Sequence, residues 1–140
     1  MEKKTEKKRP KIGVGCMILR NNKVLLGQRK GAHGSATYGW VGGHLEFGET
    51  FEQCVERKIY EESGLVVENL TLLCMSNVID YEKHYLDIEF IAGNVLGEPK
   101  ILKSTIVSWG WYDLDNLPSP LFKPVEMAIE SYKNGTVYNS

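Results

Sequence analysis

Acidic side chains gather on a short predicted helix, with a spacing that suits a divalent cation. Arg57 and Glu61 are four residues apart, so they share one face of a helix and the guanidinium can reach the carboxylate. Glu62 points into the adjacent sector, and two neighbouring carboxylates repel each other unless they share a cation. Hard ions such as Mg²⁺ prefer oxygen ligands and keep positions open for phosphate oxygens. Glu49, just before the helix, either folds back toward this site or favours the positive end of the helix.

Two glycines precede these carboxylates in the chain. Gly42 and Gly43 present a carbonyl that no side chain obstructs, so a ligand can approach the backbone closely. The segment therefore contains the parts of a site for a metal ion and a phosphate group. A solvated helix face that bears acidic residues is the alternative interpretation.

The elements that position these residues can be predicted from local patterns. Thr50 and Gln53 form a capping-box pattern and Gly64 suits a C-terminal cap, which together predict a helix over 51–63. Before it, the apolar runs 12–19 and 23–27 flank an Asn-Asn turn and predict a β-hairpin.

Later segments complete an α/β pattern. Strands are predicted at 65–77, 85–95 and 107–112, followed by an amphipathic helix over 124–133. In the second of these strands, Asp87 and Glu89 alternate with apolar residues, which is the period of a half-buried strand. One early and one terminal helix predict a sheet that is covered on both faces.

Length and composition limit the classes of protein. The 140 residues suit one domain, which we expect over 11–140, and the charged segment 1–10 is expected to be a disordered arm. The net charge of −1 argues against nucleic acid as a partner, and no apolar run is long enough to span a membrane. The three cysteines lie among apolar neighbours, which is typical of buried thiols, so we expect a cytoplasmic protein.

The spacing of the whole segment resembles a known motif. The sequence GHLEFGETFEQCVERKIYEESGL is similar to the Nudix box, G-x5-E-x7-R-E-U-x-E-E-x-G-U with U aliphatic, at every fixed position but one. The resemblance implies an α/β/α sandwich with a mixed sheet between helices. It also implies hydrolysis of a nucleoside diphosphate derivative that depends on Mg²⁺, with Mn²⁺ as the alternative ion. The stretch GGHLEFGET further resembles the MutT-like branch, which implies hydrolysis of a (d)NTP to NMP and pyrophosphate.

The resemblance also implies roles for individual residues. Glu61, Glu62 and the carbonyl of Gly42 would hold the metal ion. Arg57 would orient Glu61, and Glu49 would support the metal site, so the expected catalytic set contains these residues with Glu61 and Glu62. Members often supply one more acidic ligand from a later loop; Glu89 and Glu98 are candidates here, and no spacing rule chooses between them.

The one departure from the motif is Lys58, where the family has Glu. Lys58 lies three residues before Glu61 and four before Glu62, so its ammonium group could pair with both carboxylates. A positive charge at this position weakens the binding of Mg²⁺. Either activity survives with a reduced metal set, or the chain binds nucleotide and hydrolyses it poorly. A third alternative is that position 58 carries a substitution.

Candidate substrate residues lie near the glycines. Arg29 and Lys30 are expected to meet the substrate phosphate, although solvated loop charges are an equal alternative. Tyr38 is an aromatic residue that could stack on a base or belong to the core, and His44 adjoins the site but could be structural. The expected partner is therefore a nucleotide, and a homodimer is an open possibility.

Overall fold

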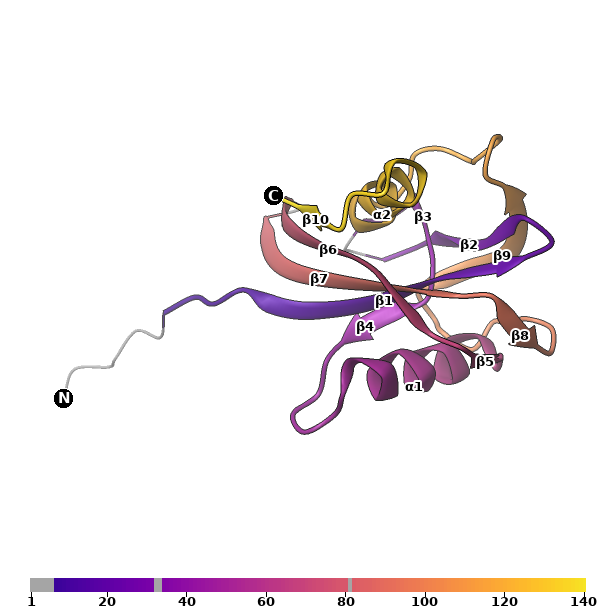
Figure 1. Cartoon of the computed structure of the whole chain (residues 1–140), viewed down its shortest axis with the longest axis horizontal. Coiled ribbons are helices and arrows are strands. Elements are labelled where there is room, and N and C mark those ends of the chain that lie inside the picture. Colours follow the sequence, from indigo (N-terminus) through magenta and orange to yellow (C-terminus); the bar gives the residue numbers. More distant parts are fainter. Residues whose placement is uncertain (1–6, 32–33, 81) are drawn as a thin grey trace.

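A central sheet lies between two helices in the computed structural model, which describes residues 7–31, 34–80 and 82–140. Helix α1 (Phe51–Ser63) lies against one face of the sheet and helix α2 (Lys123–Asn134) against the other (Figure 1). The architecture confirms the predicted α/β/α sandwich.

The sheet is mixed, and strand β1 (Lys11–Arg20) is at its centre. Strand β1 runs parallel to β7 (Lys83–Ala92) on one side. On its other side it pairs antiparallel, first with β4 (Gly42–His44) and then with β2 (Lys23–Arg29). The remaining strands of the sheet are β3 (Tyr38–Gly39), β6 (Thr71–Asp80), β9 (Ile106–Asp113) and β10 (Tyr138–Asn139). A separate two-stranded sheet joins β5 (Val66–Glu68) to β8 (Asn94–Leu96).

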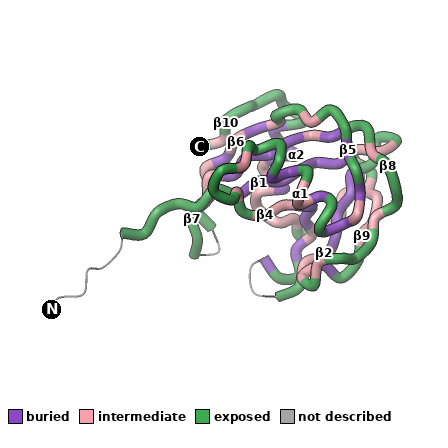
Figure 2. Tube along the Cα trace, turned by 90° about the horizontal axis from the view of Figure 1, so that it is seen from below, coloured by how far each residue is buried: buried purple, intermediate pink, exposed green. Residues whose placement is uncertain are grey.

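Alternation along β1 divides the core into two layers, because successive side chains of a strand point to opposite faces. Val14, Cys16 and Ile18 pack on the α1 side together with Ile59 of that helix. Met17 packs on the α2 side, in a cluster that includes Val24, Leu26, Trp40, Cys74, Val125, Ala128 and Ile129. The buried stretches run through the interior of the domain, whereas residues 7–10 are exposed where the chain leaves it (Figure 2).

Both helices have defined ends. At the start of α1 the Thr50 hydroxyl accepts from the Gln53 backbone, and the Gln53 side chain accepts from the Thr50 N–H, so the predicted capping box forms. Gly64 ends the helix in the left-handed conformation, with φ of 74°. Gly135 does the same for α2, with φ of 78°. The helix that was predicted over 51–63 therefore has the predicted bounds.

Three predictions about strands need correction. The segment predicted as one strand over 85–95 is divided into β7, which ends at Ala92, and β8, which begins at Asn94 and pairs with β5 in the separate sheet. The segment predicted as one strand over 65–77 is divided into β5 and β6, because Asn69 adopts a positive φ of 57° and turns the chain. The polar face of β7 was expected to be exposed, yet Asp87 and Glu89 are buried. The sheet is covered on both faces, so the polar side of this strand is covered as well.

The arm that was expected over 1–10 falls partly on residues 1–6, which lie outside the described residues. Residues 7–10 form no helix or strand and are exposed. Within the described ranges, neither helix has the length and apolar character needed to span a membrane.

Candidate active site

Strand β4 brings the two glycines against the acidic end of α1. Gly42 pairs with Gly15 and Gly43 with Val14 of strand β1, which fixes the backbone of both residues. The end of the Lys58 side chain lies against Gly43, in the space that a Cβ atom would enter, so a side chain there would make the lysine shift. Helix α1 therefore packs directly on the glycine backbone, with its carboxylates beside it.

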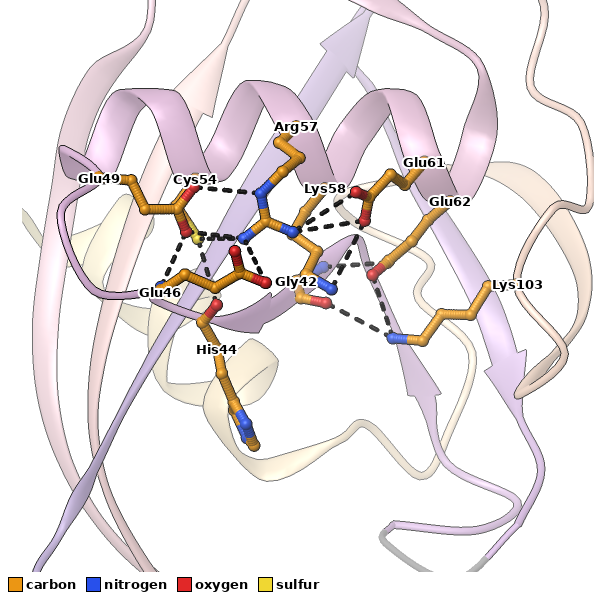
Figure 3. A network of polar contacts seen from close by, with 10 residues as sticks. All are labelled: Gly42, His44, Glu46, Glu49, Cys54, Arg57, Lys58, Glu61, Glu62 and Lys103. Carbon is orange, nitrogen blue, oxygen red and sulfur yellow. Dashed lines mark hydrogen bonds and ion pairs between the residues drawn. The ribbon is translucent and has the colours of Figure 1, made fainter.

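Arg57 holds the loop before α1 to the helix. Its Nε and Nη2 atoms donate to both oxygens of Glu49, at 3.1 and 2.6 Å, and its Nη1 lies 3.4 Å from Oε2 of Glu61 (Figure 3). The hydrogen bonds from Arg57 lower the pKa of Glu49 to about 2, and those bonds also raise the pKa of Arg57. The predicted contact between Arg57 and Glu61 is present, and Glu49 folds back toward the site.

The ion pair between Arg57 and Glu49 predicts that the free energy of unfolding depends on pH. The pKa of Glu49 falls from 4.5 to about 2 on folding, so the pair stabilises the protein fully above about pH 4.5 and loses that contribution as the pH falls toward 2. We expect the difference in unfolding free energy between the wild type and Glu49→Gln to be constant from pH 5 to 7 and to shrink as the pH falls from 4.5 toward 2. Urea denaturation at a series of pH values measures it. A difference that stays unchanged down to pH 2 would show that the Arg57–Glu49 contact does not form.

Glu62 is the buried carboxylate of the site, with a side chain 5% exposed. Its Oε1 accepts a hydrogen bond from the Gly42 N–H at 3.2 Å, and its Oε2 accepts one from Lys103 Nζ at 3.1 Å. The same ammonium group donates to the Gly42 carbonyl at 3.4 Å. Burial raises the pKa of Glu62, and the charge of Lys103 opposes that rise. One lysine therefore occupies the position between the two oxygens that the sequence assigns to a metal ion.

Glu61 lies at the exposed side of the site, with half of its side chain accessible. Its carboxylate faces Arg57 and the ammonium group of Lys58, which lies 3.7 Å away. The predicted ion pair between Lys58 and Glu61 is thus present, whereas Glu62 takes its cation from Lys103 instead.

The balance of charge at the site follows from these contacts. The site contains four carboxylates and three cationic groups. The carboxylates are those of Glu46, Glu49, Glu61 and Glu62, and the cationic groups are those of Arg57, Lys58 and Lys103. Within the described ranges, no group of three or more His, Cys, Asp or Glu side chains gathers to hold a metal ion. The oxygens of Gly42, Glu61 and Glu62 are hard donors that suit Mg²⁺. A divalent ion fits this donor set only in exchange for the ammonium group of Lys103, whose side chain is 30% exposed and therefore has room to move.

Comparison with known proteins identifies the family. The family model of the NUDIX domain matches residues 9–132, which is most of the chain. The chain belongs to the Nudix family. The segment Gly43–Leu65, from which the resemblance was drawn, is therefore its Nudix box.

Individual relatives are named as hydrolases or pyrophosphatases. An ADP-ribose pyrophosphatase of Methanocaldococcus jannaschii is 34% identical over 131 residues, which cover 90% of this chain and 76% of the relative. An oxidized purine nucleoside triphosphate hydrolase of Danio rerio is 34% identical over 106 residues, covering 73% of this chain and 65% of the relative. The crystal structure of a MutT NUDIX hydrolase from Burkholderia pseudomallei is 34% identical with a TM-score of 0.84, over 88% of this chain and 98% of that one. The chain is thus a member of a family of hydrolases, as predicted.

A cleft of about 180 Å³ opens beside the Nudix box, on the α2 side of the sheet. Gly42 and Lys103 line it where it meets the box, and its lining also includes His44 and Arg29. The His44 ring points away from the carboxylates and lies 3.0 Å from the Tyr85 hydroxyl (Figure 3). Burial, followed by the charges of nearby lysines, lowers the pKa of His44, so the ring is neutral at pH 7.

The predicted substrate residues separate into two groups. Arg29 lies 4.0 Å above the Phe122 ring, and both side chains line the cleft together with His44. Lys30 is exposed beyond the end of β2, and the Tyr38 ring stacks edge-on against Tyr112. Neither Lys30 nor Tyr38 lines the cleft, so Arg29 and His44 are the substrate candidates that the structure brings together.

Lys103 is the site residue that the sequence analysis missed. It follows a proline-containing loop and belongs to no motif, and it lies 41 residues from Glu62. Glu98, a candidate for a further metal ligand, instead pairs with Arg20 at 3.2 Å. The loop after β8 thus brings a positive charge to the Nudix box.

The contact of Lys103 with Glu62 predicts a change in stability that Mg²⁺ opposes. We expect Lys103→Met to lower the free energy of unfolding by about 1–3 kcal/mol in EDTA, because Glu62 is left buried without its cation. Added Mg²⁺ is expected to stabilise this variant more than the wild type, because the competing ammonium group is gone. Urea unfolding with and without Mg²⁺ measures both effects, and Lys23→Met, at an exposed position of β2, is the control. Equal stabilisation of the two proteins by Mg²⁺ would exclude competition at this position.

Proposed function

We propose that the chain hydrolyses a nucleoside diphosphate derivative, namely a (d)NTP, in the presence of Mg²⁺ or Mn²⁺ to give NMP and pyrophosphate. The observation that supports this proposal is that the buried carboxylate of Glu62 and the carbonyl of Gly42 meet at a single point, where both accept from Lys103, at the end of a cleft. A site of this type binds an anionic diphosphate through a shared cation.

Residues of the chain would hold and position the metal ion. Gly42 would contribute its carbonyl, Glu62 its buried carboxylate and Glu61 its exposed one. When bound, a divalent ion neutralises phosphate charge and lowers the pKa of an attacking water. Because Glu62 is fixed by the Gly42 N–H, its remaining lone pairs stay directed into the site.

Other residues would keep the carboxylates in place. Arg57 fixes Glu61 relative to the loop that carries Glu49. Arg57 and Glu49 would therefore be positioning residues that do not touch the substrate. Arg29 and His44 line the cleft beyond the box and are the groups available to the rest of the nucleotide. A guanidinium group suits a phosphate oxygen, and a neutral imidazole suits a sugar or base.

The experiment is a panel of nucleotides and dinucleotides incubated with the purified chain and excess Mg²⁺ or Mn²⁺. Ribo- and deoxynucleoside triphosphates, ADP-ribose and NAD are the substrates, and NMP and pyrophosphate are separated by chromatography. Formation of NMP with pyrophosphate from a triphosphate supports the proposal. Failure to convert any of these compounds with either metal would rule out hydrolysis.

A second candidate function is nucleotide binding with weak catalysis. The observation that favours it is the presence of two ammonium groups, those of Lys58 and Lys103, among the carboxylates of the box. They reduce the negative charge that attracts a divalent ion and offer direct partners to phosphate oxygens. This function predicts that nucleotide raises the melting temperature in EDTA while no product forms in Mg²⁺. The cytoplasmic location, the absence of a nucleic-acid partner and the homodimer remain predictions.

A further inference from the structure

Two carboxyl groups lie at the floor of the cleft, outside the Nudix box. Asp87 and Glu89 are two residues apart on β7, so they point to the same face of the sheet, the face that α2 covers. Both are buried, and the exposed fraction of Glu89 is only 2%. Their neighbours on β1 are Gly13 and Gly15, and a Cβ atom at Gly15 would collide with the Glu89 carboxyl group. Because β1 has no side chains at these two glycines, the carboxyl groups of Asp87 and Glu89 face the cleft.

The hydrogen bonds of the two groups differ. Glu89 accepts from the Trp40 indole N–H at 2.9 Å through one oxygen and at 3.4 Å through the other. Asp87 has an oxygen, Oδ2, that is buried and has no hydrogen-bond partner within the described residues. A buried polar atom without a partner is costly, so it marks a position where a ligand can supply the missing donor.

Burial is the main cause of a raised pKa at both residues, and the Asp87 charge raises that of Glu89 further. The two carboxyl groups thus destabilise the protein in the absence of a donor. They lie in a space of about 180 Å³, whereas one buried water needs only about 10–15 Å³. The cleft is large enough for a flat ring.

The walls of the cleft favour a planar ligand. Trp40, His44, Tyr85 and Phe122 line it around the two carboxyl groups. The cleft continues to Gly42 and Lys103, where the proposed diphosphate site begins. A nucleotide with its phosphates at the box would therefore place its base toward the carboxyl groups.

We propose that Asp87, supported by Glu89, recognises the exocyclic amino group of the nucleobase. This inference rests on the proposed nucleotide site and adds the class of base. The unpaired Oδ2 of Asp87 can accept a hydrogen bond from a base amino group, whereas a base without an amino group at that place leaves this oxygen without a donor. A site that contains a buried acceptor discriminates strongly against an analogue that lacks the donor, because the acceptor is then left unpaired.

The test measures binding, by the shift in melting temperature and by calorimetry at one pH in Mg²⁺, so that it does not depend on turnover. The probes are three matched pairs that differ in one amino group: GTP and ITP, ATP and purine riboside triphosphate, and CTP and zebularine triphosphate. We expect at least one amino-bearing member to bind about tenfold or more tightly than its partner. Equal binding in all three pairs, or preference for the amino-free members, would overturn the inference.

A variant separates recognition from a structural role. Asp87→Leu keeps about the size of the side chain, removes both acceptor oxygens and is expected to abolish the discrimination within the preferred pair. It is also expected to raise the melting temperature without nucleotide, since it removes a buried carboxyl group next to Glu89. Asp113→Leu, at the exposed end of β9, is the matched control and should change neither property. Unchanged discrimination in Asp87→Leu would contradict the inference.

The outcomes are distinguishable from those of the proposed hydrolysis. Discrimination between the paired nucleotides without any product would contradict the hydrolysis and support recognition by Asp87. Turnover of all six nucleotides at similar KM would support the hydrolysis and contradict recognition by Asp87.

Discussion

Replacing Glu62 with glutamine is expected to lower kcat by about 10²–10³-fold for whichever nucleotide the wild type hydrolyses. The carboxylate is buried, receives the Gly42 N–H and lies beside the Gly42 carbonyl, so it is the fixed oxygen donor of the site. The neutral amide leaves a divalent ion with much weaker charge compensation, and metal-based stabilisation of a transition state is worth several kcal/mol.

Steady-state kinetics across Mg²⁺ concentrations measures the effect of Glu62→Gln. The variant is expected to require more Mg²⁺ for half-maximal rate as well as turning over more slowly. Glu56→Gln is the matched control, because Glu56 is exposed on the same helix. Wild-type kcat in Glu62→Gln would mean that the buried carboxylate has no part in the reaction.

Replacing Lys58 with glutamate is expected to increase activity. The change converts a positive charge beside Glu61 into a negative one and restores the residue that the Nudix box contains at this position. Two charges about 4 Å apart interact by about 4 kcal/mol at the effective dielectric constant of a protein surface. After discounting for solvent, since a quarter of the Lys58 side chain is exposed, we expect the affinity for Mg²⁺ to rise by about tenfold or more.

Lys58→Met separates the loss of the positive charge from the gain of a negative one. Methionine keeps a long side chain against the Gly43 backbone and removes only the charge. It is expected to fall between the wild type and Lys58→Glu in Mg²⁺ affinity, measured by calorimetry, and in kcat/KM at limiting Mg²⁺. If neither variant binds Mg²⁺ more tightly than the wild type, Lys58 does not oppose the metal ion, and the weak-catalysis alternative rests on Lys103 alone.

Local patterns in the sequence were sufficient for the Nudix helix and its ends. Thr50, Gln53 and Gly64 act through hydrogen bonds within a few residues, so their positions determine where α1 begins and ends. The contact of Arg57 with Glu61 follows from helical spacing in the same way.

Contacts between segments that are distant in the chain could not be predicted from the sequence. Lys103 reaches Glu62 only because the loop after β8 passes beside β4, and no local pattern encodes that path. Asp87 shows the other limit, since alternation along β7 marks a polar face and does not reveal that α2 covers it. The same alternation would be found in a sheet with one solvated face.

The central claim is that Gly42, Glu61 and Glu62 hold a divalent ion beside a diphosphate. A crystal grown with Mn²⁺ and an α,β-methylene nucleoside triphosphate, measured at the manganese absorption edge, tests it most directly. The account predicts an anomalous peak bonded to the Gly42 carbonyl and Glu62, with the ammonium group of Lys103 displaced from both. A nucleotide bound elsewhere, with Lys103 still donating to Glu62 and no manganese beside it, would contradict the account.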